Sequence, residues 1–241
     1  MSGPKAKPKR KMPSQKPSAT KQVVDPGDGR PKRSVVEVPK PKRNIPVFGI
    51  VIGVIAVLLV AAVTLTSGSA PGSEFGEPSV SGDGLPPFQS TAGDTAIGET
   101  APVVTGQDFD GNEVVVGEAG TPAAIVFLAH WCSHCQAEVP RVQEWLDNGG
   151  GVEGVEIVSV ATSMNSAQPN FPPSAWLERE GWTSPVLLDD TDSSTLLSYG
   201  AGGFPYWVFL NADGTVAARS AGQLDIPQLE AFMNLIAASN A

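Results

Sequence analysis

The sequence predicts an α/β domain in which a central mixed sheet is flanked by helices, with a single transmembrane helix preceding this domain. Three observations lead to this prediction. Residues 45–66 are apolar and carry no charge. From about residue 97, apolar runs typical of buried strands alternate with helical patterns, and a Cys-x-x-Cys motif directly follows the most apolar of these runs.

Residues 1–44 form a basic tail. Thirteen of the sixteen Lys and Arg residues lie within 1–43, where three acids oppose them, whereas the rest of the chain has three Arg against 22 acids. The tail is rich in Lys, Pro and Ser and has no aromatic residue, so it is expected to be disordered. A basic run also suits nucleic acid, but the apolar segment directly after it explains the charge better, and no nucleic-acid partner is expected.

The apolar segment 45–66 has the length of a bilayer span, which needs about 20 residues. Lys40, Lys42 and Arg43 precede it, and the next basic residue is Arg141. The positive-inside rule then predicts a single-pass protein of the cell membrane, with a cytoplasmic N-terminus and an extracytoplasmic C-terminal domain. A cleaved signal peptide is the alternative, but its apolar core would be shorter, about 7–15 residues, so an uncleaved anchor is favoured.

Residues 67–96 are rich in Gly, Ser and Pro and are predicted to form a flexible linker to a folded domain at 97–241. Within that domain, glycines, prolines and an Asn-Ala-Asp-Gly turn separate the apolar runs. The expected strands cover 113–117, 123–129, 155–161, 186–188, 206–210 and 215–220. The expected helices run from the Cys motif to about 146 and over 172–180, 193–199 and 226–238.

The two cysteines of the chain are Cys132 and Cys135, and the loop between them is too short for a structural disulfide to constrain the unfolded chain much. At the start of a helix, free N–H groups and the helix dipole favour a thiolate. Cys132 is therefore expected to attack a substrate disulfide and Cys135 to resolve the mixed disulfide. Between them lie Ser133 and His134. Positive charge on His134 would favour oxidant behaviour, unless His134 is simply a solvated helix residue.

Metal and haem sites explain the motif less well. Zinc needs four ligands, and Cys132, Cys135, His130 and His134 lie within six residues, too close together for a strand-to-helix turn to converge them on one ion. A c-type haem would need His where Gln136 stands. Copper(I) binding by the two thiolates stays open as chemistry. The sequence thus predicts neither a metal nor a cofactor.

Residues 97–239 resemble the thioredoxin superfamily, and within it the membrane-anchored TlpA/ResA-like thiol–disulfide oxidoreductases. The resemblance is carried by residues 125–135, with Trp131 directly before the first cysteine, by Pro140 in the following helix, and by Gly203-Phe204-Pro205-Tyr206 before a strand. It is carried also by Ala101-Pro102 and Phe109-Asp110-Gly111-Asn112 at the start of the domain. The expected fold is thus thioredoxin-like.

The resemblance implies roles for several residues. Cys132 and Cys135 would be catalytic, Pro205 would follow a cis peptide bond beside them together with Phe204, and Trp131 would cover one side of the site. One position departs from the pattern, since Val126 stands where thioredoxins have a buried Asp that accepts a proton from the second thiol. Glu138 and His130 are the candidates for this proton transfer.

The predicted function is thiol–disulfide exchange on extracytoplasmic proteins. The resemblance favours a disulfide reductase supplied by a membrane-bound redox partner, for example in cytochrome c maturation. The alternatives are an oxidant that forms disulfides in secreted proteins and a copper carrier that uses the same cysteines. A peroxidase is disfavoured, because Ala129 stands where its Thr-x-x-Cys signature requires Thr.

The segment 163–181 is long for a link between a strand and a helix and carries Asn165, Asn170, Phe171 and Trp176. It is predicted either to form a partner-binding lip or to pack around a longer helix, and the helix is the favoured interpretation.

Overall fold

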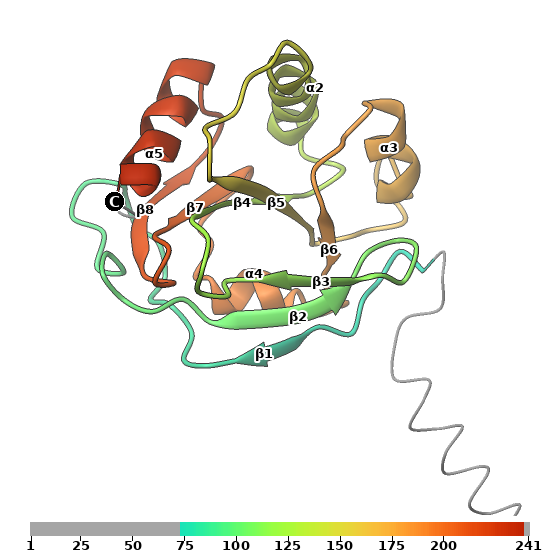
Figure 1. Ribbon diagram of the computed structural model, residues 1–241. Helices are drawn as coiled ribbons and strands as arrows, with labels where there is room; N and C mark the ends of the chain where they lie inside the picture. The colour runs from blue at the N-terminus through green and yellow to red at the C-terminus, as the bar shows by residue number, and fades with distance from the viewer. Residues whose placement is uncertain (1–72, 239–241) are drawn as a thin grey trace, which may run out of the picture. The chain divides into compact units, whose positions relative to one another are not determined.

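The computed structural model describes residues 73–238, which form a five-stranded sheet, a three-stranded sheet and four helices (Figure 1). The larger sheet has the order β6-β5-β4-β7-β8 and consists of β4 (Ala123–Leu128), β5 (Glu156–Ala161), β6 (Val186–Leu188), β7 (Tyr206–Leu210) and β8 (Val216–Ala221). The smaller has the order β1-β2-β3 and consists of β1 (Ser79–Ser81), β2 (Val103–Gln107) and β3 (Glu113–Val116). The helices are α2 (Ser133–Asp147), α3 (Pro173–Arg179), α4 (Ser194–Ser198) and α5 (Ile226–Ala238).

The larger sheet is mixed, as predicted. β4 pairs in parallel with β5 and β5 with β6, whereas β7 runs antiparallel to both β4 and β8. This arrangement places the C-terminal ends of β4 and β5 and the start of β7 next to one another, at the same end of the strands. The loops that follow or precede these ends therefore meet there.

Strand β4 is the centre of the sheet, and alternate side chains enter two separate cores. Ala124, Val126 and Leu128 pack with α2, α3 and α5, while Ile125 and Phe127 pack with β2, β3 and α4. Figure 1 shows these two layers, with α2, α3 and α5 on one face and the β1–β3 sheet with α4 on the other. The predicted helical cover is thus confirmed on one face, and on the other it is largely a second sheet.

The predicted elements have the observed bounds to within two residues, and those of β6, β7 and α5 coincide. Two expectations for the remaining chain were wrong. The segment 163–181 does not hold a long helix, since α3 covers only Pro173–Arg179. Residues 73–96, expected in a flexible linker, instead pack on the domain and carry β1. The Gly-, Ser- and Pro-rich composition of residues 73–96 did not indicate packing, because the contacts come from individual residues and not from a periodic apolar pattern.

The N-terminal extension (residues 73–96) is held by backbone pairing and by buried side chains. The Gly76 N–H donates to the Asp189 carbonyl at 2.9 Å, and the Leu85 N–H donates to the Ser198 carbonyl at 2.8 Å. A Cβ at Gly76 would lie 2.2 Å from the Leu188 carbonyl oxygen, so only glycine fits there. Ala96 is fully buried. The folded unit therefore begins before residue 97.

A buried arginine joins this extension to β8. Arg219 is fully buried, and its Nε donates to Asp94 Oδ2 at 2.7 Å, with a second bond from Nη2 to Oδ1. Its Nη1 donates to the carbonyls of Pro86 and Tyr199, and its guanidinium lies 5.5 Å from the centre of the Phe88 ring. The hydrogen bonds from Arg219 hold the pKa of the Asp94 carboxyl below its usual value.

No helix among residues 73–238 has the length and apolar character that a membrane crossing requires. The basic tail and the apolar segment 45–66 lie outside the described residues.

The Arg219–Asp94 pair generates a stability prediction. Asp94→Asn leaves a buried guanidinium without its counter-charge and should lower the free energy of unfolding by about 3–5 kcal/mol. Because the carboxyl pKa is depressed on folding, the pair stabilises the fold above the ordinary value of 3.8 and ceases to do so as the pH falls through the folded value. The measurement is denaturant unfolding from pH 7 down to pH 3.

The matched control is Glu180→Gln, which removes the exposed ion pair between Arg179 and Glu180 and should cost less than about 1 kcal/mol. Equal losses for both variants, or a loss for Asp94→Asn that does not shrink in acid, would contradict the assignment.

Candidate active site

The Cys-x-x-Cys motif lies at the junction of β4 and α2. Cys132 is the N-cap of α2 with extended backbone angles, and its N–H donates to the Ala129 carbonyl at 3.0 Å. Both cysteines are free thiols; Cys132 is half-buried and Cys135 is fully buried. Burial raises the pKa of the Cys135 thiol well above its usual range, and the Glu138 charge adds to this effect. The helix therefore presents one thiol to a partner and keeps the other inside.

The cis-proline loop faces the half-buried thiol of Cys132. The Phe204–Pro205 peptide bond is cis, as the resemblance implied, and the Phe204 carbonyl oxygen lies 3.9 Å from Cys132 Sγ. Pro205 is buried, and its carbonyl accepts a 2.8 Å hydrogen bond from the Gly222 N–H. The structure thus brings together residues that are 72 positions apart in the chain.

Trp131 stands between two loops. Its indole is 37% exposed, contacts the Phe204 ring edge-on at 5.9 Å, and donates from Nε1 to the Ser163 carbonyl at 2.7 Å. Trp131 therefore links the cis-proline loop to the β5–α3 loop (residues 162–172), and it borders the site as the resemblance implied.

Ser133 and His134 are both exposed on the first turn of α2. His134 Nδ1 lies 3.0 Å from Gln223 Oε1, so the ring donates a hydrogen bond to the loop after β8. An amide oxygen accepts this bond from either the neutral or the charged ring. Nothing in the sequence singled out Gln223, because it is an isolated polar residue far from the motif.

His130 is buried and is not available for the predicted proton transfer. Its Nδ1 lies 2.7 Å from the Pro169 carbonyl, which can only accept, and its Nε2 lies 3.1 Å from the Asn165 N–H, which can only donate. Both ring nitrogens are therefore occupied by the β5–α3 loop. This part of the prediction was wrong, since the backbone partners lie 35 or more residues away in the chain.

Glu138 lies one helical turn after Cys135 and is 1% exposed. Its Oε1 accepts hydrogen bonds from Trp207 Nε1 at 3.0 Å and from the Leu224 N–H at 3.2 Å, and Arg141 pairs with Oε2. Burial raises the pKa of this carboxyl, although these partners oppose the rise. Val126, at the position where thioredoxins carry Asp, is fully buried among apolar side chains.

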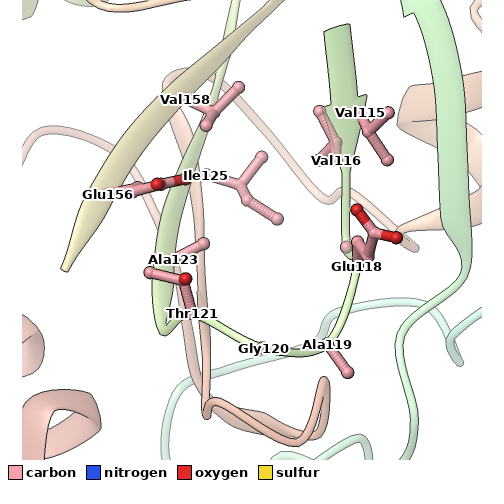
Figure 2. A pocket seen from close by; sticks show the side chains of 11 residues that line it. Val115, Val116, Glu118, Ala119, Gly120, Thr121, Ala123, Ile125, Glu156 and Val158 are labelled. Carbon is pink, nitrogen blue, oxygen red and sulfur yellow. The ribbon is translucent and has the colours of Figure 1, made fainter. Parts of the chain in front are cut away.

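Two pockets lie at opposite ends of β4. One, of about 450 Å³, is lined by Trp131, Phe75 and residues of the β5–α3 loop. The other, of about 240 Å³, lies at the start of β4, where Ile125 and Val158 face Val115 and Val116 (Figure 2). The pocket beside Trp131 is the one next to the cysteines.

Within residues 73–238, no group of three or more His, Cys, Asp or Glu side chains is placed to hold a metal ion.

Comparison with known proteins adds a family to this geometry. The model of the family described as redoxin matches residues 96–233, which is more than half of the chain. The chain belongs to the redoxin family. This redoxin is 31% identical over 122 residues to the thiol–disulfide oxidoreductase ResA of Geobacillus thermodenitrificans (strain NG80-2), a match that covers 50% of this chain and 67% of the relative.

A second ResA protein and one solved structure are also similar to this chain. ResA of Geobacillus kaustophilus (strain HTA426) is 28% identical over 142 residues, covering 58% of this chain and 78% of the relative. Among solved structures, the thioredoxin domain of a thiol–disulfide oxidoreductase from Bacteroides vulgatus is 26% identical with a TM-score of 0.47, covering 58% of this chain and 99% of that one. The ResA relatives confirm the resemblance to ResA-like proteins, so this redoxin is a thioredoxin-like thiol–disulfide oxidoreductase.

The asymmetry of the two thiols generates a reactivity prediction. In the reduced chain, iodoacetamide should modify Cys132 first, and Cys135 roughly 100-fold more slowly, because a buried thiol with a raised pKa rarely forms the reactive thiolate. Peptide mass spectrometry of a time course checks this. In Cys132→Ser, Cys135 should stay unmodified until denaturant is added; modification of Cys135 in the native variant at the rate of Cys132 would contradict the prediction.

Proposed function

We propose that this redoxin is an extracytoplasmic, membrane-anchored disulfide reductase for exported proteins. The observation that carries the proposal is the pairing of the half-buried Cys132, facing the Phe204 carbonyl, with the fully buried Cys135 on the same helical turn. Such a pair can attack a polypeptide disulfide from outside and then close on itself. The ResA relatives bear the name of thiol–disulfide oxidoreductases, which supports the proposal.

The reaction proceeds in two exchange steps. The Cys132 thiolate attacks one sulfur of the substrate disulfide, a Cys132–substrate disulfide forms, and the second substrate sulfur leaves as a thiolate and takes up a proton. Cys135 then loses its proton and attacks Cys132 Sγ, so that the enzyme disulfide forms and the first substrate sulfur leaves. Two electrons pass from enzyme to substrate, and a membrane-bound donor of the thiol class restores the reduced pair.

The second step needs a proton acceptor for Cys135, and Glu138 suits this role. Val126 has no group that accepts a proton, and His130 is occupied at both nitrogens. Glu138 is close enough for its charge to raise the pKa of Cys135, and its own raised pKa makes it a better base than an ordinary carboxylate. Its hydrogen bonds to Trp207 and Leu224 hold it in place.

Location and orientation follow from the sequence. The segment 45–66 would span the membrane once, and the basic residues before it would stay in the cytoplasm. The acidic domain would then lie on the extracytoplasmic side, the compartment in which protein disulfides persist. Protease added to intact cells should remove the domain but leave the tail; complete protection of the domain would overturn this orientation.

The role of Glu138 is testable by rapid kinetics. Glu138→Gln should slow the decay of the mixed disulfide by about 100-fold while leaving its formation unchanged. In the parent chain the decay should slow as the pH falls through the raised pKa of Glu138, and the variant should lack this dependence. Glu144→Gln, on the exposed side of the same helix, is the control. Equal slowing of both steps would mean that the substitution disturbs the structure of the site, and that Glu138 is not the proton acceptor for Cys135.

The direction of the reaction is testable by the reduction potential of the full chain, equilibrated against dithiothreitol and glutathione buffers. A reductase should lie near the thioredoxin value of about −270 mV, whereas a disulfide-forming oxidant should approach about −120 mV. The exposed His134 within the motif is the observation that favours the disulfide-forming oxidant. Uptake of one copper(I) per chain without a two-electron titration would instead point to a copper carrier.

A further inference from the structure

The loops after β4 and β5 and the loop before β7 carry no acidic or basic side chain apart from two histidines in the segments named next. Residues 119–137, 157–177 and 193–212 contain no Asp, Glu, Lys or Arg, although 22 acids follow residue 43. These three segments include the loops after β4 and β5 and the loop before β7, which the sheet topology brings to the same end of the strands. These three segments are therefore uncharged, although the domain that carries them is strongly acidic.

His130, two residues before Cys132, holds the β5–α3 loop in place through two hydrogen bonds of its ring. A carbonyl acceptor at Nδ1 and an N–H donor at Nε2 require one neutral tautomer, with the proton on Nδ1. The edge of the ring also meets Phe171 at 5.7 Å. The partners of the ring are uncharged, and the nearest recorded cation is Arg179, which reaches the loop through Asn170.

The β5–α3 loop depends on these contacts for its shape. Ser163 and Asn170 have φ values of 50° and 60°, a left-handed conformation that costs free energy for residues other than glycine. The Ser163 carbonyl accepts from Trp131, and the Asn170 amide lies 3.5 Å from the His130 carbonyl. Both strained positions are thus tied to the dipeptide His130-Trp131.

The pocket of about 450 Å³ lies between Trp131 and this loop. Its loop side consists of Ser163, Met164, Asn165, Ser166 and Gln168, all uncharged, and most of them offer a hydroxyl or amide group. The indole of Trp131, which is also in contact with Phe204, forms the side nearest the nucleophile. A substrate strand that reaches Cys132 can place a neighbouring side chain in this pocket.

We propose that the β5–α3 loop is the recognition element for polypeptide substrates, that its pocket takes an uncharged side chain next to the reacting cysteine, and that His130 positions this loop. The inference rests on the proposed function, since it concerns the substrate of that same pair of thiols. His130 is a positioning residue and takes no part in the proton or electron transfer. A small disulfide that does not reach the pocket does not need His130 to position the loop.

The first test compares His130→Phe, which keeps a ring but loses both hydrogen bonds, with His130→Gln, which keeps a donor and an acceptor. Full-length chains in mild detergent reduce either 2-hydroxyethyl disulfide or a disulfide-linked peptide with Gln beside its cysteine. His130→Phe should raise KM for the peptide about tenfold, with kcat and the rate on the small disulfide unchanged. His130→Gln should restore the peptide KM to within about threefold of the parent.

The outcomes separate the hypotheses. Parallel losses on both substrates, or an unchanged KM for the peptide, would overturn the positioning role of His130. Failure of the parent chain to reduce either disulfide would instead overturn the proposed function.

The second test changes the pocket and leaves the hydrogen bonds of His130 in place. Ser166 is exposed and lines the pocket. Ser166→Asp should weaken the peptide with Asp beside its cysteine and favour the one with Lys, changing the ratio of their kcat/KM values about tenfold relative to the parent. The small disulfide should react as before. An unchanged ratio would place the substrate side chain elsewhere and overturn the pocket assignment.

Discussion

The site depends on the burial of β4 on both of its faces. Because this strand is covered on both faces, its backbone position is set by two cores and by hydrogen bonding to β5 and β7. Cys132, four residues after its C-terminal end, is the N-cap residue of helix α2. A strand with one solvent-exposed face would leave the nucleophile on a less rigid support.

The same core that fixes the motif also creates its chemistry. Helical geometry turns Cys135 towards Val126, Val139 and their neighbours, and the loss of solvent keeps that thiol protonated. Glu138, one turn further along, is buried against Trp207 and shares this environment. In the proposed reaction, Glu138 on the helix would take the role of the acidic group that thioredoxins carry on the strand at the position of Val126.

The sequence alone was sufficient for the central sheet, the helix that begins at the Cys-x-x-Cys motif and the cis-proline loop, because each depends on local patterns: apolar runs, a four-residue motif and a Gly-Phe-Pro turn. It failed where long-range contacts decide the structure. The N-terminal extension has a linker-like composition, yet Arg219 reaches Asp94 across 125 residues and Gly76 fits against Leu188. His130 looked like a proton acceptor, and only the fold shows that distant backbone groups occupy both of its nitrogens.

The packed extension has a geometric consequence for the proposed anchor. A span that ends at residue 66 leaves six residues, 67–72, before the first described residue of the domain. Six residues reach at most about 20 Å even when fully extended. The proposed anchor would then keep the domain close to the membrane, so both its electron donor and its polypeptide substrates would have to meet it within a thin layer above the lipid surface.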